Sequence, residues 1–421
     1  MNSRERVLAA IEHREPDRVP ADLGATIMSG IMAQAIPGLR RCLGLDDRPP
    51  KVYEPFQMLG EVEEDLVEAL GVDVLPVEPP AQFFGIRREN YKPFRLFDDT
   101  PVLVPGQFNV EVDDQGRWLL HEQGDAARPV TAIMPKEGFY FDMVGDQAMH
   151  EDFQPPPLAH MRKQYRTPAD ERDLEYLAAK AQRLRPTGKA LVLGAWGYIG
   201  PAGVGNFADW MCVMAGDPDY ARRLFEIKIE ADLARLEKLK RYIGDTIDVL
   251  GVDGNDYGTQ RAEMFSPAMF EQFYFPYYQA ICGWVHAHTK WKTWKHCCGS
   301  IPRFIPFMVE AGIDCLNPVQ CSAAGMEPAW LKQTFGNRLT FWGGGIDTQK
   351  TLPFGTPEQV YEQARERLRI FKPGGGYVFN AVHNIQHGTP PENIAAMFQA
   401  LKDHGKYTAD AGKLHHAAGK G

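Results

Sequence analysis

The chain has 421 residues, 44% of them hydrophobic and 24% charged, which is the composition of an ordinary globular protein with a sizeable core. Its 46 Lys and Arg against 55 Asp and Glu give a formal net charge of -9 and no basic run for a phosphate backbone, so nucleic acid is not an expected partner. Seven cysteines in so long a chain are too few and too irregular for a disulfide framework.

The first predicted element is a helix over residues 2–13, capped by Asn2 or Ser3 and stopped by Pro16. This N-terminus is charged from Arg4 onward and lacks the apolar core of a signal peptide. No apolar stretch is long enough to span a bilayer. We therefore expect a cytoplasmic protein with reduced thiols and no membrane association.

Eight short β-rich runs alternate with longer helical patterns along the chain. The runs lie at residues 18–23, 72–77, 190–195, 247–252, 292–297, 314–319, 340–344 and 376–381. Helical patterns such as 219–243 and 356–371 separate them. Eight strand–helix units are what a (β/α)₈ barrel requires, so we predict an α/β fold of the TIM-barrel type.

The spacing between the second and third runs is much longer than the others. Here the sequence FNVEVDDQGRWLLHEQ alternates around a turn from Asp113 to Gly116, which predicts a β-hairpin. We predict an insertion at about residues 90–185, part of which helps to roof the barrel mouth. The whole of residues 1–404 is then one barrel domain, and residues 405–421 form a flexible tail.

Polar side chains follow five of the predicted strands, at the end where barrel active sites lie. A helix cap would explain any one of them, but convergence of five strand ends favours a site. Asp253 and Asp256 are the candidate proton carriers. The candidate substrate-binding residues are Asn255, Asn317, Gln320, Asp347, Asn384 and Gln386.

The motif KHCCGS at residues 295–300 places a histidine beside two cysteines. Side chains at i and i+2 of a strand share a face, so His296 and Cys298 point together into the mouth and Cys297 points into the core. His and Cys are typical zinc ligands, but a catalytic site needs a third. Cys321, His383 and His387 are the candidates, and spacing alone does not choose among them.

Five segments together resemble the uroporphyrinogen decarboxylase superfamily, and within it the branch of cobalamin-dependent methyltransferases. They are SRERVLAAIEHREPDRVPADLG, SPAMFEQFYFPYY, HCCGSIPRFIPFMVEAGIDCLNPVQ, GGGIDTQKTLPFGTPEQV and GGGYVFNAVHNIQHGTPPENI. The resemblance implies a (β/α)₈ barrel and enzymatic activity, and a homodimer is a reasonable expectation from it. The arginine-rich signature RQAGRY of the porphyrin decarboxylases is missing, which disfavours decarboxylation of a porphyrin.

In the methyltransferase branch, a H-x-C pair and a later cysteine hold zinc. His296 and Cys298 match the pair, and His383 stands in the place of the later cysteine, so the resemblance implies His383 as third ligand. One thiolate and two neutral imidazoles leave the site with a formal charge of +1, which suits an oxygen ligand such as a methyl ether. No D-x-H-x-x-G corrinoid motif occurs, so any corrinoid is expected on a separate protein.

The hypothesis is therefore a zinc-dependent methyltransferase that passes a methyl group from a small, O-methylated substrate to a corrinoid protein. One alternative is a corrinoid-independent decarboxylase or lyase acting on a small carboxylate. Another is a non-catalytic barrel that binds a tetrapyrrole or corrinoid.

Overall fold

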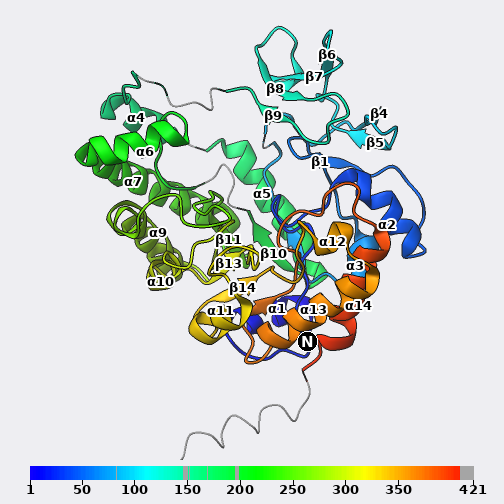
Figure 1. Cartoon of the computed structure of the whole chain (residues 1–421). Helices are drawn as coiled ribbons and strands as arrows, with labels where there is room; N and C mark the ends of the chain where they lie inside the picture. Colours follow the sequence, from blue (N-terminus) through cyan, green and yellow to red (C-terminus); the bar gives the residue numbers. More distant parts are fainter. Residues whose placement is uncertain (82, 146–149, 151, 168, 195–198, 408–421) are drawn as a thin grey trace, which may run out of the picture.

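The structure is a computed structural model that describes the chain except residues 82, 146–149, 151, 168, 195–198 and 408–421. Its centre is a parallel sheet surrounded by helices, and the segment between the second and third barrel strands extends above one end of it (Figure 1). No helix in the described part of the chain is long and apolar enough to cross a membrane.

Seven strands of the described chain form the barrel sheet, and all neighbouring pairs are parallel. Across the sheet they are β15 (Tyr377–Val378), β14 (Thr340–Trp342), β13 (Cys315–Asn317), β12 (Lys292–His296), β11 (Val249–Asp253), β10 (Ala190–Leu193) and β3 (Val74–Pro76). Strands β10 and β11 are buried along their whole length, as expected where helices cover one face and the barrel core the other. The predicted barrel fold is confirmed.

The first predicted strand closes the circle although it makes only a short bridge. The Asp22 N–H donates to Phe379 O at 2.9 Å on one side, and the Asp73 N–H donates to Ala21 O at 2.9 Å on the other. Ala21 thereby joins the outer edges of β15 and β3. Pro20 has no N–H to extend the ladder, which helps to keep this strand short.

Fourteen α-helices are found in the described residues. They are α1 (Ser3–Ile11), α2 (Ile36–Cys42), α3 (Glu64–Leu70), α4 (Leu158–Tyr165), α5 (Glu171–Leu184), α6 (Phe207–Gly216), α7 (Pro218–Ile243), α8 (Pro267–Met269), α9 (Phe275–His288), α10 (Ile305–Glu310), α11 (Pro328–Phe335), α12 (Thr351–Phe354), α13 (Pro357–Phe371) and α14 (Pro391–His404). Proline is the first residue of α7, α11, α13 and α14, where its missing N–H costs nothing.

Helix α1 lies at the end of the barrel opposite the predicted site. Asn2 and Glu5 form a reciprocal capping box at its start, so Asn2 is the cap. Arg6 binds Asp73, which precedes β3, at 2.6 Å, and Arg4 binds Asp248, which precedes β11, also at 2.6 Å. The helix is thus fixed to the N-terminal ends of two barrel strands.

The segment between β3 and β10 carries its own antiparallel strands. They are β4 (Lys92–Arg95), β5 (Pro101–Val104), β6 (Val110–Val112), β7 (Trp118–His121), β8 (Val130–Met134) and β9 (Asp142–Met143). The predicted hairpin is the β6–β7 pair, with Val110 opposite Leu120. A further antiparallel pair, β1 (Val52–Glu54) and β2 (Leu59–Gly60), is not evident from the sequence pattern.

The inserted segment touches the loop that follows the eighth strand. The ring of Phe139 stacks on that of His387 with 3.2 Å between centroids. The first residues of the predicted tail are also held, because Val19 N–H donates to Gly405 O at 2.9 Å and Tyr407 N–H to Asp17 O at 3.2 Å. From residue 408 onward the predicted tail lies outside the described residues.

Candidate metal centre

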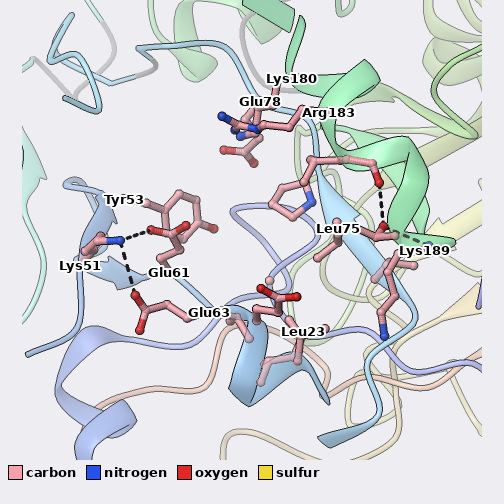
Figure 2. A pocket seen from close by; sticks show the side chains of 18 of the residues that line it. Leu23, Lys51, Tyr53, Glu61, Glu63, Leu75, Glu78, Lys180, Arg183 and Lys189 are labelled. Carbon is pink, nitrogen blue, oxygen red and sulfur yellow. Dashed lines mark hydrogen bonds and ion pairs between the residues drawn. The ribbon is translucent and has the colours of Figure 1, made fainter. Parts of the chain in front are cut away.

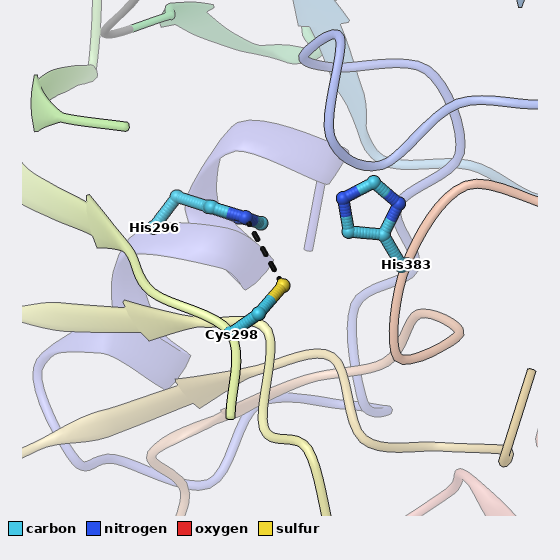
Figure 3. A group of neighbouring side chains, drawn as sticks. All are labelled: His296, Cys298 and His383. Atoms are coloured by element: carbon cyan, nitrogen blue, oxygen red, sulfur yellow. Dashed lines mark hydrogen bonds between the residues drawn. The ribbon is translucent and has the colours of Figure 1, made fainter. Parts of the chain in front are cut away.

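Three side chains meet at the C-terminal end of the barrel strands: those of His296, Cys298 and His383 (Figure 3). His296 is the last residue of β12, Cys298 lies two residues later, and His383 lies in the loop after β15. One ligand atom from each lies within 4.8 Å of the other two. The fold therefore brings together three residues that are separated by up to 87 positions in the sequence.

Strand alternation explains which of the two neighbouring cysteines belongs to the group of three side chains. His296 and Cys298 face the same side, and the His296 Nε2 atom lies 3.4 Å from the Cys298 Sγ atom. Cys297 is fully buried in the hydrophobic core, and its Sγ accepts the N–H of Tyr257 at 3.2 Å. Burial raises the pKa of Cys297 to about 12. As the alternation predicted, Cys297 is a core residue.

The imidazole of His296 is oriented by Asn317 at the end of the neighbouring strand β13. The Asn317 Nδ2 atom donates to Trp342 O at 2.9 Å, so its Oδ1 atom must be the one that lies 2.7 Å from His296 Nδ1. An acceptor there requires the proton on Nδ1. The lone pair of Nε2 is consequently left free toward Cys298, which is the tautomer a metal ligand needs.

Asp256 borders the same group. Its Oδ1 atom accepts the Cys298 N–H at 2.6 Å and lies 3.4 Å from His296 Nε2. Burial opposes ionisation of Asp256, but the neighbouring His296 ring and the hydrogen bond from the Cys298 N–H outweigh it and lower the pKa of Asp256. Burial, together with the Asp256 carboxylate, raises the pKa of the Cys298 thiol. A bound cation would instead lower the pKa of the Cys298 thiol.

His383 approaches from the opposite side of the mouth. Its ring centroid lies 5.4 Å from that of His296, with an angle of 72° between the rings. Burial, and then the neighbouring His296, lowers the pKa of His383 to about 4. The imidazole is neutral at neutral pH, and a neutral imidazole can donate a lone pair to a metal.

Asp253 does not face the mouth as a free carboxylate. It is 1% exposed, and its Oδ2 atom binds Lys295 Nζ at 2.7 Å and the hydroxyls of Tyr257 and Tyr278 at 2.7 and 2.5 Å. Its Oδ1 atom accepts from the backbone and side-chain amides of Asn255. With both oxygens occupied, Asp253 is a structural anion, and Asn255 is bound to it.

The other predicted substrate-binding residues make structural contacts. Gln320 accepts the Gly299 N–H at 2.8 Å, which holds the loop after Cys298. Asp347 caps a turn by accepting the N–H of Gln349 at 2.7 Å. The structure thus brings Gln320 near the metal-binding loop and leaves Asp347 in a capping role.

Asn384 and Gln386, which were also predicted to bind substrate, differ in their exposure to solvent. Asn384 is fully buried, accepts the Gly30 N–H at 2.6 Å and donates to Ile27 O at 2.7 Å, so it fixes the loop after the first strand. Gln386 is exposed and donates to Asn384 O at 3.1 Å. Of this pair, Gln386 alone has a side chain open to solvent.

The two alternative third ligands lie outside the group. His387 stacks on Phe139, and the Cys321 Sγ atom bonds to Val319 O at 3.4 Å. Neither belongs to the set of close ligand atoms found in the described residues. The geometry therefore favours His383.

Sequence reasoning missed three buried charges near the mouth. Lys295 is fully buried and, besides Asp253, bonds to Asn255 O at 2.7 Å and to His296 O. Asp22 and Glu78 end the first two strands and are also buried. Burial raises the pKa of Asp22 to about 6. The signal that could have found these two carboxylates is their position at strand ends.

The residue set fits a zinc ion. At bond lengths of about 2.0–2.3 Å, two atoms on one tetrahedral zinc lie roughly 3.4–3.7 Å apart, and the Nε2–Sγ distance of 3.4 Å agrees. The imidazole that Asn317 orients presents its lone pair on the correct side. Three protein ligands leave one tetrahedral position open, as catalytic zinc sites do.

The chain is similar in sequence to one protein family and to several characterised proteins. A family model described as uroporphyrinogen decarboxylase (URO-D) matches residues 152–404, more than half of the chain. A methylated-thiol–coenzyme M methyltransferase of Methanosarcina mazei is 31% identical over 109 residues, which are 26% of this chain and 27% of that protein. A uroporphyrinogen decarboxylase of Dechloromonas aromatica is 24% identical over 220 residues, 48% of this chain and 54% of that protein.

These matches span between about a quarter and a half of the length of the curated relatives. A solved structure, a methyltransferase from Methanosarcina mazei, covers far more. It superposes with a TM-score of 0.54 at 15% identity over 96% of this chain and 99% of that one. This likeness shows that the two share a fold.

Proposed function

The chain belongs to the uroporphyrinogen decarboxylase family, and from this premise we propose that it is a zinc-dependent methyltransferase. It would remove the methyl group of a small, O-methylated substrate and transfer it to a corrinoid carried by a separate protein. The observation that carries the proposal is the convergence of His296, Cys298 and His383 at the barrel mouth. A methyltransferase among the relatives supports the reaction class.

The donor set supports an oxygen-bound substrate. One thiolate and two neutral imidazoles would leave the site with a formal charge of +1, since burial keeps His383 neutral. When bound, zinc would supply a Lewis acid for the oxygen that loses its methyl group. A site with two thiolates would be neutral and better suited to a softer sulfur ligand.

The chain's own residues would orient the ligands and manage protons. Asn317 fixes the tautomer of His296, and Lys295 holds the backbone carbonyls of Asn255 and His296. Asp256 is the better candidate proton carrier, because its lowered pKa keeps it ionised beside the mouth while Asp253 is fully engaged. Loss of the methyl group leaves an oxygen that needs a proton, and a carboxylate at this position can take a proton from water and pass it to that oxygen.

Turnover with a separate methyl acceptor tests the proposal. Zinc-loaded protein would be mixed with reduced cob(I)alamin and 2-methoxyphenol, and methylcobalamin and catechol would be measured together. We expect both products in equal amounts from the wild type and from Cys297→Ala, and neither from Cys298→Ala. Release of carbon dioxide from small carboxylates without any corrinoid would instead support a decarboxylase.

One methoxylated substrate that is turned over is enough to decide between these reactions. A supporting result requires that methyl transfer depends on the presence of cobalt in the reduced state and on Cys298. If a panel of methoxylated arenes and alkyl ethers gives no methylcobalamin with fully zinc-loaded protein, the O-demethylation proposal is wrong.

A further inference from the structure

One cavity of the described chain lies outside the candidate metal centre. It has a volume of about 540 Å³ and is lined by residues of β1, α3, β3 and α5 and by the ends of the adjoining loops. None of His296, Cys298 and His383 lines it. The cavity is therefore distinct from the group of metal-binding side chains.

One end of the cavity holds an unsatisfied carboxylate oxygen and two side-chain cations without partners in the described chain. Glu78 is 1% exposed, and its Oε1 atom has no hydrogen-bond partner among the described residues, whereas its Oε2 atom binds Arg88 Nη2 at 2.7 Å. Lys180 and Arg183, both on α5, have no hydrogen bond or ion pair within the described chain. Figure 2 shows Glu78, Lys180 and Arg183 gathered at this end.

An unsatisfied buried oxygen costs free energy unless a ligand or water supplies a donor. Lys180 is half-buried, and burial lowers the pKa of Lys180 to about 8 despite the opposing charge of Glu78. An anion could pair with the half-buried Lys180 and with the exposed Arg183, and the buried Glu78 oxygen calls for an N–H or O–H donor. Both requirements are met at the same end of the cavity.

The other parts of the cavity differ in character. Lys51 and Lys189 are paired, with Glu63 at 3.4 Å and with Glu68 at 3.0 Å, so they have no free charge to offer. The wall between the two ends is apolar and is made by Leu23, Val62, Val67, Val74, Leu75 and Leu184. Such a wall accepts a hydrocarbon group.

We propose that this cavity binds a small α-amino or α-hydroxy acid with an apolar side chain. The carboxylate of the ligand pairs with Lys180 and Arg183, and its neighbouring amino or hydroxyl group donates to Glu78 Oε1. The donor is placed next to the carboxylate because Glu78 and Arg183 both lie close enough to Lys180 for their charges to act on it. The side chain of the ligand packs against the apolar wall.

Calorimetric titration of the full-length protein with four matched compounds tests this site. L-Phenylalanine and L-phenyllactate carry both the carboxylate and the donor; 3-phenylpropionate lacks the donor, and 2-phenylethylamine lacks the carboxylate. We expect binding of one or both of the first two, at least about tenfold tighter than of the last two. The first pair distinguishes an amino acid from a hydroxy acid as the natural source.

Variants then locate the binding. Lys180→Met and Arg183→Met break no contact seen in the described chain, so they should fold, and each should weaken binding by about tenfold or more. Lys51→Met, at the other end of the cavity, is the matched control and should bind as the wild type does. Absence of binding by all four compounds, or unchanged binding in both α5 variants, would overturn the proposal.

The metal-centre variant Cys298→Ala separates this result from the proposed function. It should bind the amino or hydroxy acid normally, since it contributes nothing to the cavity. Loss of methyl transfer with retained binding is the result expected of this variant. In the wild type, binding without methyl transfer, or methyl transfer without binding of any of the four compounds, would show that one proposal has failed without the other.

Discussion

The Oδ1 atom of Asn317 accepts a hydrogen bond from the Nδ1 atom of His296 at 2.7 Å, across the neighbouring strands β13 and β12. Both side chains are almost completely buried. The bond fixes the ring orientation and the tautomer of His296, and so determines which nitrogen faces Cys298. The candidate metal centre therefore depends on a residue that is not itself a ligand.

Removal of this support should weaken metal binding. For Asn317→Ala we predict an affinity for zinc roughly 10–100-fold lower than that of the wild type, measured by competition with a chromophoric chelator. Asn393→Ala is the matched control, because Asn393 is an equally buried asparagine that bonds to Leu352 O and Gly355 O. Equal affinities in the wild type and Asn317→Ala would contradict this role.

The buried ion pair between Lys295 and Asp253 should contribute to the free energy of unfolding. Lys295→Met leaves Asp253 without its cation and should lower the free energy of unfolding by about 3–5 kcal/mol in chemical denaturation. The double variant Lys295→Met/Asp253→Asn should recover part of this loss, because no unpaired charge remains. Lys402→Met, at an exposed position on α14, serves as the control. A loss of under about 1 kcal/mol for Lys295→Met would argue against this role.

Glu54 should make stability depend on pH. Burial raises the pKa of Glu54 to about 7 from 4.5, so folding takes up a proton between these values. The stabilisation is full below pH 4.5 and is lost as the pH rises through about 7. Relative to Glu54→Gln, the wild type should lose about 3 kcal/mol between pH 4.5 and pH 8, measured by urea denaturation. A difference that stays constant across this range would refute the shifted pKa.

Asp256 should affect turnover more than metal content. Asp256→Asn keeps an acceptor for the Cys298 N–H but removes the charge, so zinc should be retained while methyl transfer falls by about 10²-fold or more. Asp219→Asn, an exposed aspartate on α7, should behave as the wild type. Full turnover by Asp256→Asn would show that this carboxylate carries no proton in the reaction.

Much of the barrel could be predicted because its signals are local. Short apolar runs predicted the strands, and i, i+2 alternation along one strand was enough to separate Cys297 from Cys298. The hairpin around Asp113 and Gly116 was equally local, since Gly116 adopts φ +74° and closes the turn with Asp113 O. Each of these features depends on residues that are near one another in the chain.

Roles set by tertiary contacts could not be predicted in the same way. The sequence pattern presents Asp253 as a free acid at a strand end, but Lys295 from the next strand and Tyr278 from α9 engage it. Asn384 is expected from its position to bind substrate, yet it fixes the loop near Gly30, more than 350 residues away in sequence. No periodic pattern reports such partners, because they become neighbours only when the barrel closes.

The most direct test of the metal centre is the amount of zinc per chain in protein purified without added metal. The wild type is compared with Cys297→Ala, Cys298→Ala and His383→Ala, with circular dichroism to confirm that each variant folds. We predict close to one zinc in the wild type and in Cys297→Ala, and little or none in the other two. No zinc in the wild type, or full retention in folded Cys298→Ala, would contradict the account.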